Sequence, residues 1–146
     1  MALSAQNPTD RAQQLLALTD RLGDRLADET VKLEAHRPQD LFEGIEETRT
    51  LSNLYRFETL KIKGNPSLLD GIAPALKQSL FEATQKFQDR LARYERAVNA
   101  SKTITEGIIT AVADDLNQRQ TTNLTYGARG RTQAPGPQSL NYGGIA

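Results

Sequence analysis

Several residue types that stabilise compact proteins are rare or missing in this chain of 146 residues. It contains no cysteine, which excludes disulfide bonds and thiolate metal sites. Tryptophan is also absent, aromatic residues make up only 5% of the chain and hydrophobic residues 38%, so a thick globular core would be hard to build. No stretch approaches the roughly 18 apolar residues that a membrane helix needs. We expect a protein without membrane insertion that needs little core.

The charge and the motifs exclude further classes. Eighteen basic and 18 acidic residues are interspersed and give a formal net charge of zero, which argues against a nucleic-acid partner. No phosphate-binding glycine loop, nucleophile elbow or zinc-protease spacing occurs. The single histidine, His36, lies at an expected helix end, and adjacent carboxylates such as Glu46 and Glu47 point to different sides of a helix. We therefore expect a protein that is not an enzyme, with no cofactor, metal site or catalytic residues.

The first eight residues lack the basic and apolar regions of a secretory signal, so we expect a frayed leader and a cytoplasmic protein. Asn7 and Thr9 can cap the start of a first helix over residues 9–37, whose apolar stripe runs from Leu15 to Leu33 and includes Thr30. Gly23 is expected on another face of this helix. Pro38 ends the helix and starts a second one over 39–63, which must run antiparallel to the first because the connection is short.

The second helix has a broad apolar face that could touch two neighbours, and Gly64-Asn65-Pro66 ends it. A short corner helix is expected over 66–72. A third helix over 74–119 is the longest, because its apolar residues recur in helical steps and no proline follows Pro74 until position 135. The fold class is therefore all-α: an elongated antiparallel three-helix bundle over residues 1–120, with a long third helix.

The unequal helix lengths are the main functional clue. Helices of 25 to 28 residues span roughly 37 to 42 Å, whereas one of about 45 residues spans roughly 68 Å. About 20 residues of the third helix would then lack a neighbour. They include the apolar residues Ile104, Ile108, Ile109, Val112 and Leu116. This stripe is expected to meet a partner helix, a second copy of the chain or the folded-back tail. In the alternative, the helix breaks near Ser101 and its end packs back as a fourth helix.

The composition changes after residue 120. Residues 121–146 hold five glycines, two prolines and no acidic residue, which predicts a disordered tail. Tyr126 and Arg129 stand beside glycines, and both residue types concentrate binding energy in small areas. Two interpretations stay open for them: a docking motif, or a plain linker.

Several segments together resemble one known family, the FlgN-type flagellar export chaperones, and most of all their alphaproteobacterial, FlbY-like branch. The likeness spans nearly the whole chain and is carried by the following segments: Glu34-Ala-His-Arg-Pro38, Asp40-Leu41, Leu54-Tyr-Arg-Phe-Glu58, Asn65-Pro-Ser-Leu-Leu69, Thr103-Ile-Thr-Glu-Gly-Ile-Ile109 and Tyr126-Gly-Ala-Arg-Gly130. The most distinctive are the last two.

The resemblance implies a cytoplasmic chaperone that binds hook-filament junction (hook-associated) subunits before their export by the flagellar type III apparatus. In that family the carboxy-terminal region engages the terminal helix of the subunit, and here it matches Ile104, Ile108, Ile109, Val112 and Leu116. A tyrosine near the carboxy terminus contacts the export-gate membrane protein; Tyr126 is the nearest match, and Tyr142 stays open as well. The competing interpretation is a structural or regulatory coiled-coil homodimer.

Overall fold

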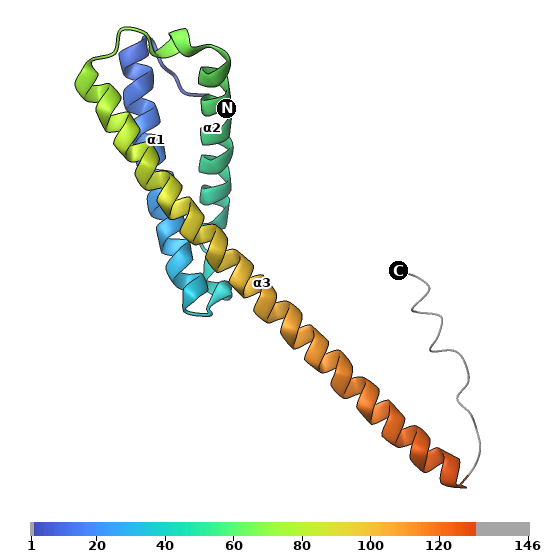
Figure 1. Ribbon diagram of the computed structural model, residues 1–146. Coiled ribbons are helices and arrows are strands. Elements are labelled where there is room, and N and C mark those ends of the chain that lie inside the picture. The colour runs from blue at the N-terminus through green and yellow to red at the C-terminus, as the bar shows by residue number, and fades with distance from the viewer. Residues whose placement is uncertain (1, 131–146) are drawn as a thin grey trace. The chain divides into compact units, whose positions relative to one another are not determined.

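Within residues 2–130 the protein is all-α, with three long helices (Figure 1). This computed structural model describes residues 2–130, and their side chains as far as Thr122. The helices are α1 (Pro8–Glu34), α2 (Ile45–Gly64) and α3 (Pro74–Gly130), with short 3₁₀ helices at Pro38–Leu41 and Pro66–Leu69. The chain divides into a first unit ending at Lys102 and a second beginning at Thr103. The predicted fold class, a helical bundle with a long third helix, is confirmed.

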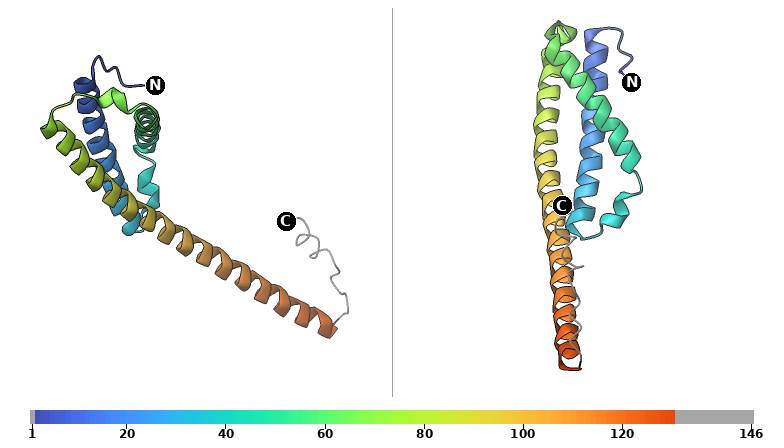
Figure 2. Two further views of the ribbon diagram at one scale, coloured as in Figure 1. Left: turned by 45° about the horizontal axis from the view of Figure 1, so that its top comes forward. Right: turned by 90° about the vertical axis from the view of Figure 1, so that its right-hand side faces the viewer.

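Within the first unit, α1 and α2 are antiparallel, and the first part of α3 runs alongside α1 (Figures 1 and 2). Ion pairs give the direction of each pairing. Arg11 and Arg21 of α1 bind Glu58 and Glu47 of α2, in reversed order. Asp24 and Glu34 of α1 bind Arg90 and Arg93 of α3, in the same order, so α1 and α3 are parallel.

Helix α1 begins as predicted, because the Asn7 side chain accepts a hydrogen bond of 2.8 Å from the Asp10 amide and Pro8 occupies the first helical turn. It ends at Glu34, three residues before the predicted end. The His36 amide donates to the Leu33 carbonyl and the Arg37 amide to the Lys32 carbonyl, a Schellman cap. His36 therefore adopts a left-handed conformation with φ of 57°.

This cap predicts a stabilising substitution. A left-handed conformation costs a non-glycine residue about 1 to 2 kcal/mol, which glycine avoids. We expect His36→Gly to raise the free energy of unfolding by about 1 kcal/mol in chemical denaturation, once the greater flexibility of glycine in the unfolded chain is subtracted. The matched control is Ala35→Gly, where φ is −82° and the same flexibility should destabilise. A loss of stability in His36→Gly would contradict this account.

The second and the corner helix differ from their predicted bounds. The helix predicted over 39–63 is split: Pro38–Leu41 forms a 3₁₀ turn, and α2 begins only at Ile45. The cause is Gly44, whose φ of 88° interrupts the helix and whose missing Cβ leaves room for the guanidinium of Arg25. The corner helix predicted over 66–72 ends at Leu69, because Asp70 is extended, with ψ of 139°.

The core follows the leucine stripe predicted for the first helix. Every member of that stripe is buried: Leu15, Leu18, Leu22, Leu26, Thr30 and Leu33. Leu22 and Leu26 pack with Phe87 of α3, and Leu51, Tyr55, Leu91 and Tyr94 close the cluster. The rings of Tyr55 and Phe87 have centroids 4.7 Å apart, so this contact joins α2 to α3.

Gly23 lies inside the interface between α1 and α3. The expectation from the sequence, that it lies on another face of the helix, is therefore wrong. A Cβ at this position would stand 3.0 Å from Nη1 of Arg90 and 3.7 Å from the Phe87 ring. Glycine thus lets α3 approach α1 closely. Arg90 then reaches Asp24 at 2.7 Å, and Arg93 pairs with Glu34 of α1.

Two carboxylates are buried between α1 and α2. Glu58 is fully buried; its carboxylate accepts from Nη1 of Arg11 at 2.9 Å and from the Leu3 amide at 2.9 Å. The segment before α1 is therefore tied to α2 by a backbone hydrogen bond, so the expectation of a frayed leader is wrong. Gln14 adds a second link, since its amide donates to the Ser4 carbonyl at 3.2 Å.

Glu29, 2% exposed, is the second buried carboxylate. It accepts from the Thr48 hydroxyl at 2.5 Å and from Arg25 at 3.5 Å. Desolvation raises the pKa of Tyr94 above its ordinary value of 10, and the charge of Glu29 and the hydrogen bond to it raise it further. The Glu29 carboxylate of α1 is thus contacted by one residue from each of the other two helices, Thr48 of α2 and Tyr94 of α3.

The raised pKa of Tyr94 gives a prediction at alkaline pH. The folded protein holds the phenol proton more tightly than the unfolded chain does, so this contribution to stability is complete below about pH 10 and is lost as the pH rises toward the folded pKa. We expect the thermal midpoint of the wild type to fall more between about pH 9 and 11 than that of Tyr94→Phe. The two proteins differ only in the phenol hydroxyl, so parallel curves would contradict the prediction.

Helix α3 is one continuous helix from Pro74 to Gly130. The alternative in which it breaks near Ser101 is therefore wrong, and the predicted end at residue 119 is too early. Of the seven Gly and Pro residues that suggested a tail from residue 121, five follow Gly130, and the first proline after Pro74 is Pro135. The Thr121 hydroxyl bonds back to the Asn117 carbonyl at 3.0 Å, as in a regular helix. The rest of the tail predicted over 121–146, residues 131–146, lies outside the described residues.

Candidate binding site

The candidate site is the apolar strip of the second unit, defined as Ile104, Ile108, Ile109, Val112 and Leu116. These residues recur in steps of one, three and four on a single helix, so their side chains share one face about 140° wide. Gly107 and the β-branched Thr103–Thr105 run lower helix propensity here. The helix nevertheless continues without a break.

Every member of the strip is exposed. The exposed fractions are 46% for Ile104, 59% for Ile108, 62% for Ile109, 54% for Val112 and 53% for Leu116. Burying one such side chain contributes about 1.5 to 3 kcal/mol. A contiguous apolar face of this kind marks a surface that binds another protein more often than it marks a solvated helix.

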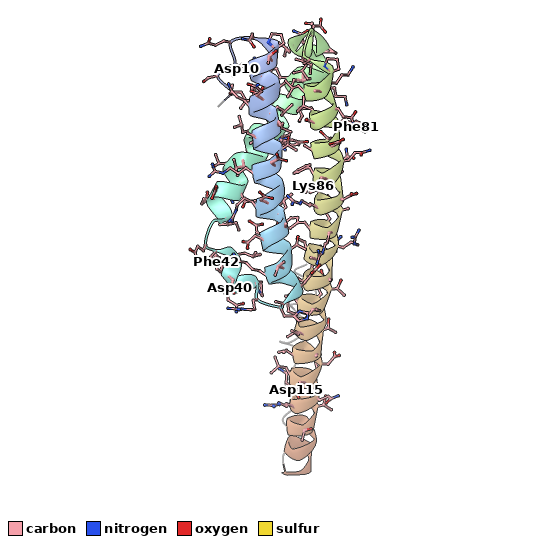
Figure 3. All side chains as sticks on the ribbon, turned by 90° about the vertical axis from the view of Figure 1, so that its left-hand side faces the viewer. Asp10, Asp40, Phe42, Phe81, Lys86 and Asp115 are labelled. Carbon is pink, nitrogen blue, oxygen red and sulfur yellow. The ribbon has the colours of Figure 1, made fainter. Side chains whose placement is uncertain are left out.

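Polar groups border the strip. Asp115 lies beside it and pairs with Arg119, one turn on, at 3.0 Å (Figure 3 labels Asp115). Glu106 and Asp114 add two more carboxylates to this part of α3. Helical spacing turns these two carboxylates toward the face opposite the strip, so the charged neighbours of the strip are Asp115 and its partner Arg119.

Tyr126 and Arg129 fall in the last turns of α3, where the backbone is helical. Their side chains lie outside the described part of the chain, so their predicted docking role stays a prediction. The backbone places them on the same helix as the strip, whereas the sequence had suggested a tail.

Sequence reasoning missed a second exposed apolar surface, on α2. Its apolar members are Leu54, Phe57 and Leu60, and the last two are 50% and 59% exposed. A shallow hollow of about 390 Å³ is lined by Thr50, Asn53, Leu54 and Phe57. The broad apolar face predicted for the second helix already indicated this surface. Helices α1 and α3 cover only one side of that face.

Two further phenylalanines are exposed singly. Phe42 lies in the connection between α1 and α2 and is 79% exposed, and Phe81 lies near the start of α3 (Figure 3).

His36 serves as the left-handed residue that caps α1. Within residues 2–130, no group of three or more His, Cys, Asp or Glu residues is placed to hold a metal ion. No helix in this range is long and apolar enough to cross a membrane.

These features define a class: an α-helical protein that exposes an apolar strip on its long third helix. The chain is 42% identical over 131 residues to the flagellar basal-body protein FlbY of Caulobacter vibrioides, an alignment that covers 89% of this chain and 88% of FlbY. The chain therefore belongs to the FlbY family and has a role related to the flagellum. No model of a protein family and no solved structure matches it.

Proposed function

We propose that this protein is a cytoplasmic, non-enzymatic chaperone of flagellar type III export. In this proposal it binds hook-filament junction (hook-associated) subunits through the apolar strip from Ile104 to Leu116. Tyr126 and Arg129, further along the same helix, contact the export-gate membrane protein. The observation that carries the proposal is the exposure of all five strip residues, between 46% and 62%, in a protein of a flagellar family.

The mechanism needs only helix packing. Flagellar subunits have amphipathic terminal helices that would otherwise assemble too early, and an exposed apolar strip can cover such a helix by forming a mixed bundle. If the client helix becomes ordered only on binding, the entropy cost of ordering offsets part of the contact energy. The affinity then stays moderate, which allows release of the client at the export gate.

The experiment is capture of hook-associated subunits by two forms of the chain. One form has all 146 residues and the other ends at Lys102, which removes the strip and everything after it while leaving the first unit. We expect the complete chain, and not the shortened one, to retain the subunits from cytoplasm and in purified form. Retention by both forms would place the client on the first unit and would contradict the proposed site.

The second candidate is a structural or regulatory coiled-coil homodimer in which two strips pair. The same exposed strip favours it, since a second copy would cover the residues in the same way. Sedimentation separates the two candidates. A dimer that dissociates when the strip is substituted, with no client bound, supports the homodimer; a monomer that captures a subunit supports the chaperone.

A further inference from the structure

The segment before α1 crosses from the start of this helix to α2, as Figure 1 shows. Residues 2–6 belong to no helix, and their exposure alternates: Leu3 and Ala5 are half-buried, whereas the other three residues are exposed. A period of two is that of an extended chain that lies with one side against the protein. We call residues 2–6 the strap.

Three side chains of α1 and α2 bind the main chain of the strap. The Glu58 carboxylate accepts from the Leu3 amide at 2.9 Å, and the side-chain amide of Gln14 donates to the Ser4 carbonyl at 3.2 Å. The carboxylate of Asp10, labelled in Figure 3, accepts from the last amide of the strap at 3.0 Å. Every peptide has such main-chain groups, so these contacts recognise an extended backbone and not a particular sequence.

The Glu58 carboxylate is the buried centre of this contact. It is fully buried, and its Oε2 atom accepts from the Arg11 guanidinium at 2.9 Å. Its Oε1 atom accepts the main-chain amide of the strap. Buried carboxylate oxygens need hydrogen-bond donors, so the ion pair with Arg11 is completed by a main-chain N–H. The strap supplies this N–H here, and another extended segment has the same group to offer.

The strap fills its site only in part. A hollow of about 220 Å³ lies beside it, with Ala5, Arg11 and Leu68 among the residues that line it. The methyl group of Ala5 leaves this space empty, so a larger side chain at the same position would gain contacts. No residue of the strap is fully buried. Opening of the strap therefore costs far less than unfolding of the protein.

We infer that the site under the strap, between the start of α1, the end of α2 and the 3₁₀ helix Pro66–Leu69, binds an extended segment of another protein. The strap occupies this site as a ligand from the same chain. An incoming segment displaces the strap, donates a main-chain N–H to Glu58, accepts from Gln14 and places an aliphatic side chain larger than alanine in the hollow. The site is separate from the apolar strip, so this inference does not rest on the proposed function.

Binding of a peptide to the complete chain, followed by NMR titration, tests the inference. The probe has the sequence of residues 2–7, with both ends blocked. We expect it to bind the Leu3→Pro variant at least about tenfold more tightly than the wild type, because proline lacks the N–H that holds the strap and the strap then competes less. The matched control is Ser4→Pro, since the Ser4 amide makes none of the three bonds. It should bind the probe as weakly as the wild type does.

Changes in the peptide test the same contacts without altering the fold of the protein. A Leu3→Pro peptide should not bind, since it has no N–H for Glu58. An Ala5→Leu peptide should bind about tenfold more tightly than the probe, because the larger side chain enters the hollow. Equal binding of the three peptides to the Leu3→Pro protein, or binding of none of them, would overturn the inference.

Hydrogen exchange in the wild type measures the opening of the strap directly. We expect the Leu3 amide to exchange at least about a hundredfold faster than the amide of Leu22, which lies in the core, because the strap opens without global unfolding. An excess of the Ala5→Leu peptide should speed exchange at Leu3 and not at Leu22. Equal protection of the two amides would show that the strap does not open by itself, and this result would also overturn the inference.

Discussion

Replacing Ile108 and Val112 with aspartate is expected to abolish capture of the client and to leave the thermal stability of the first unit nearly unchanged. Both side chains are more than half exposed in the protein alone. Folding therefore gains little from them, whereas a client helix would bury them and gain about 1.5 to 3 kcal/mol from each. Their loss corresponds to a decrease in affinity of at least about a hundredfold, and the client helix would have to bury the two new carboxylates.

The measurement is binding of a purified hook-associated subunit, followed by a thermal melt of each variant. The matched control is Thr110→Asp with Asn117→Asp, which adds the same charge to the same helix on the face opposite the strip. It should retain binding. If the control loses binding to the same extent, the effect comes from charge or helix stability. If the strip variant also melts much lower, the strip belongs to the core of the protein.

Removing the buried carboxylate of Glu58 is expected to cost about 3 to 5 kcal/mol of stability. In Glu58→Ala the guanidinium of Arg11, only 11% exposed, loses its partner, and the Leu3 amide loses its acceptor. An unpaired buried charge is far more costly than a lost surface ion pair. Since domains of this size are stable by about 5 to 15 kcal/mol, much of that stability would disappear.

Chemical denaturation measures this loss, with Glu46→Ala as the matched control. Glu46 lies on the same helix and pairs with Arg49 at 3.5 Å, but both side chains are more than two-thirds exposed, so about 0 to 1 kcal/mol is expected. The double variant Arg11→Met with Glu58→Met should recover much of the loss, because no charge is left buried. Equal effects of Glu58→Ala and Glu46→Ala would contradict the assignment of Glu58 as a buried partner.

Much of the first unit follows from local rules in the sequence. The stripe from Leu15 to Leu33 is buried because its spacing matches the period of a helix, and Asn7 with Pro8 starts α1 because both suit an amino-terminal turn. The long third helix follows from the lack of proline between Pro74 and Pro135. Such signals need no knowledge of the partners that a residue meets elsewhere in the chain.

The features that were missed depend on distant contacts. Glu58 is an acidic residue in a stretch of mixed apolar and polar side chains, and only Arg11, 47 positions earlier, explains its burial. Only the positions of Arg90 and Phe87 on α3, which lie against Gly23, show that this glycine belongs to the interface. The unequal helix lengths predict that the apolar strip has no neighbour within the chain, and its residues are exposed. Its role in binding stays a prediction, and so does the role of Tyr126 and Arg129.

The two buried carboxylates have a consequence for the folding of the α1–α2 hairpin. Leucines repeat at every turn, so on their own they would allow α2 to slide along α1 by one turn, about 5.4 Å, with little change in contact. Such a slide would part Glu58 from Arg11, leaving both charges buried without a partner, and would take the Thr48 hydroxyl away from Glu29. The hairpin therefore has a single permitted alignment, which is set by its polar residues and not by its leucines.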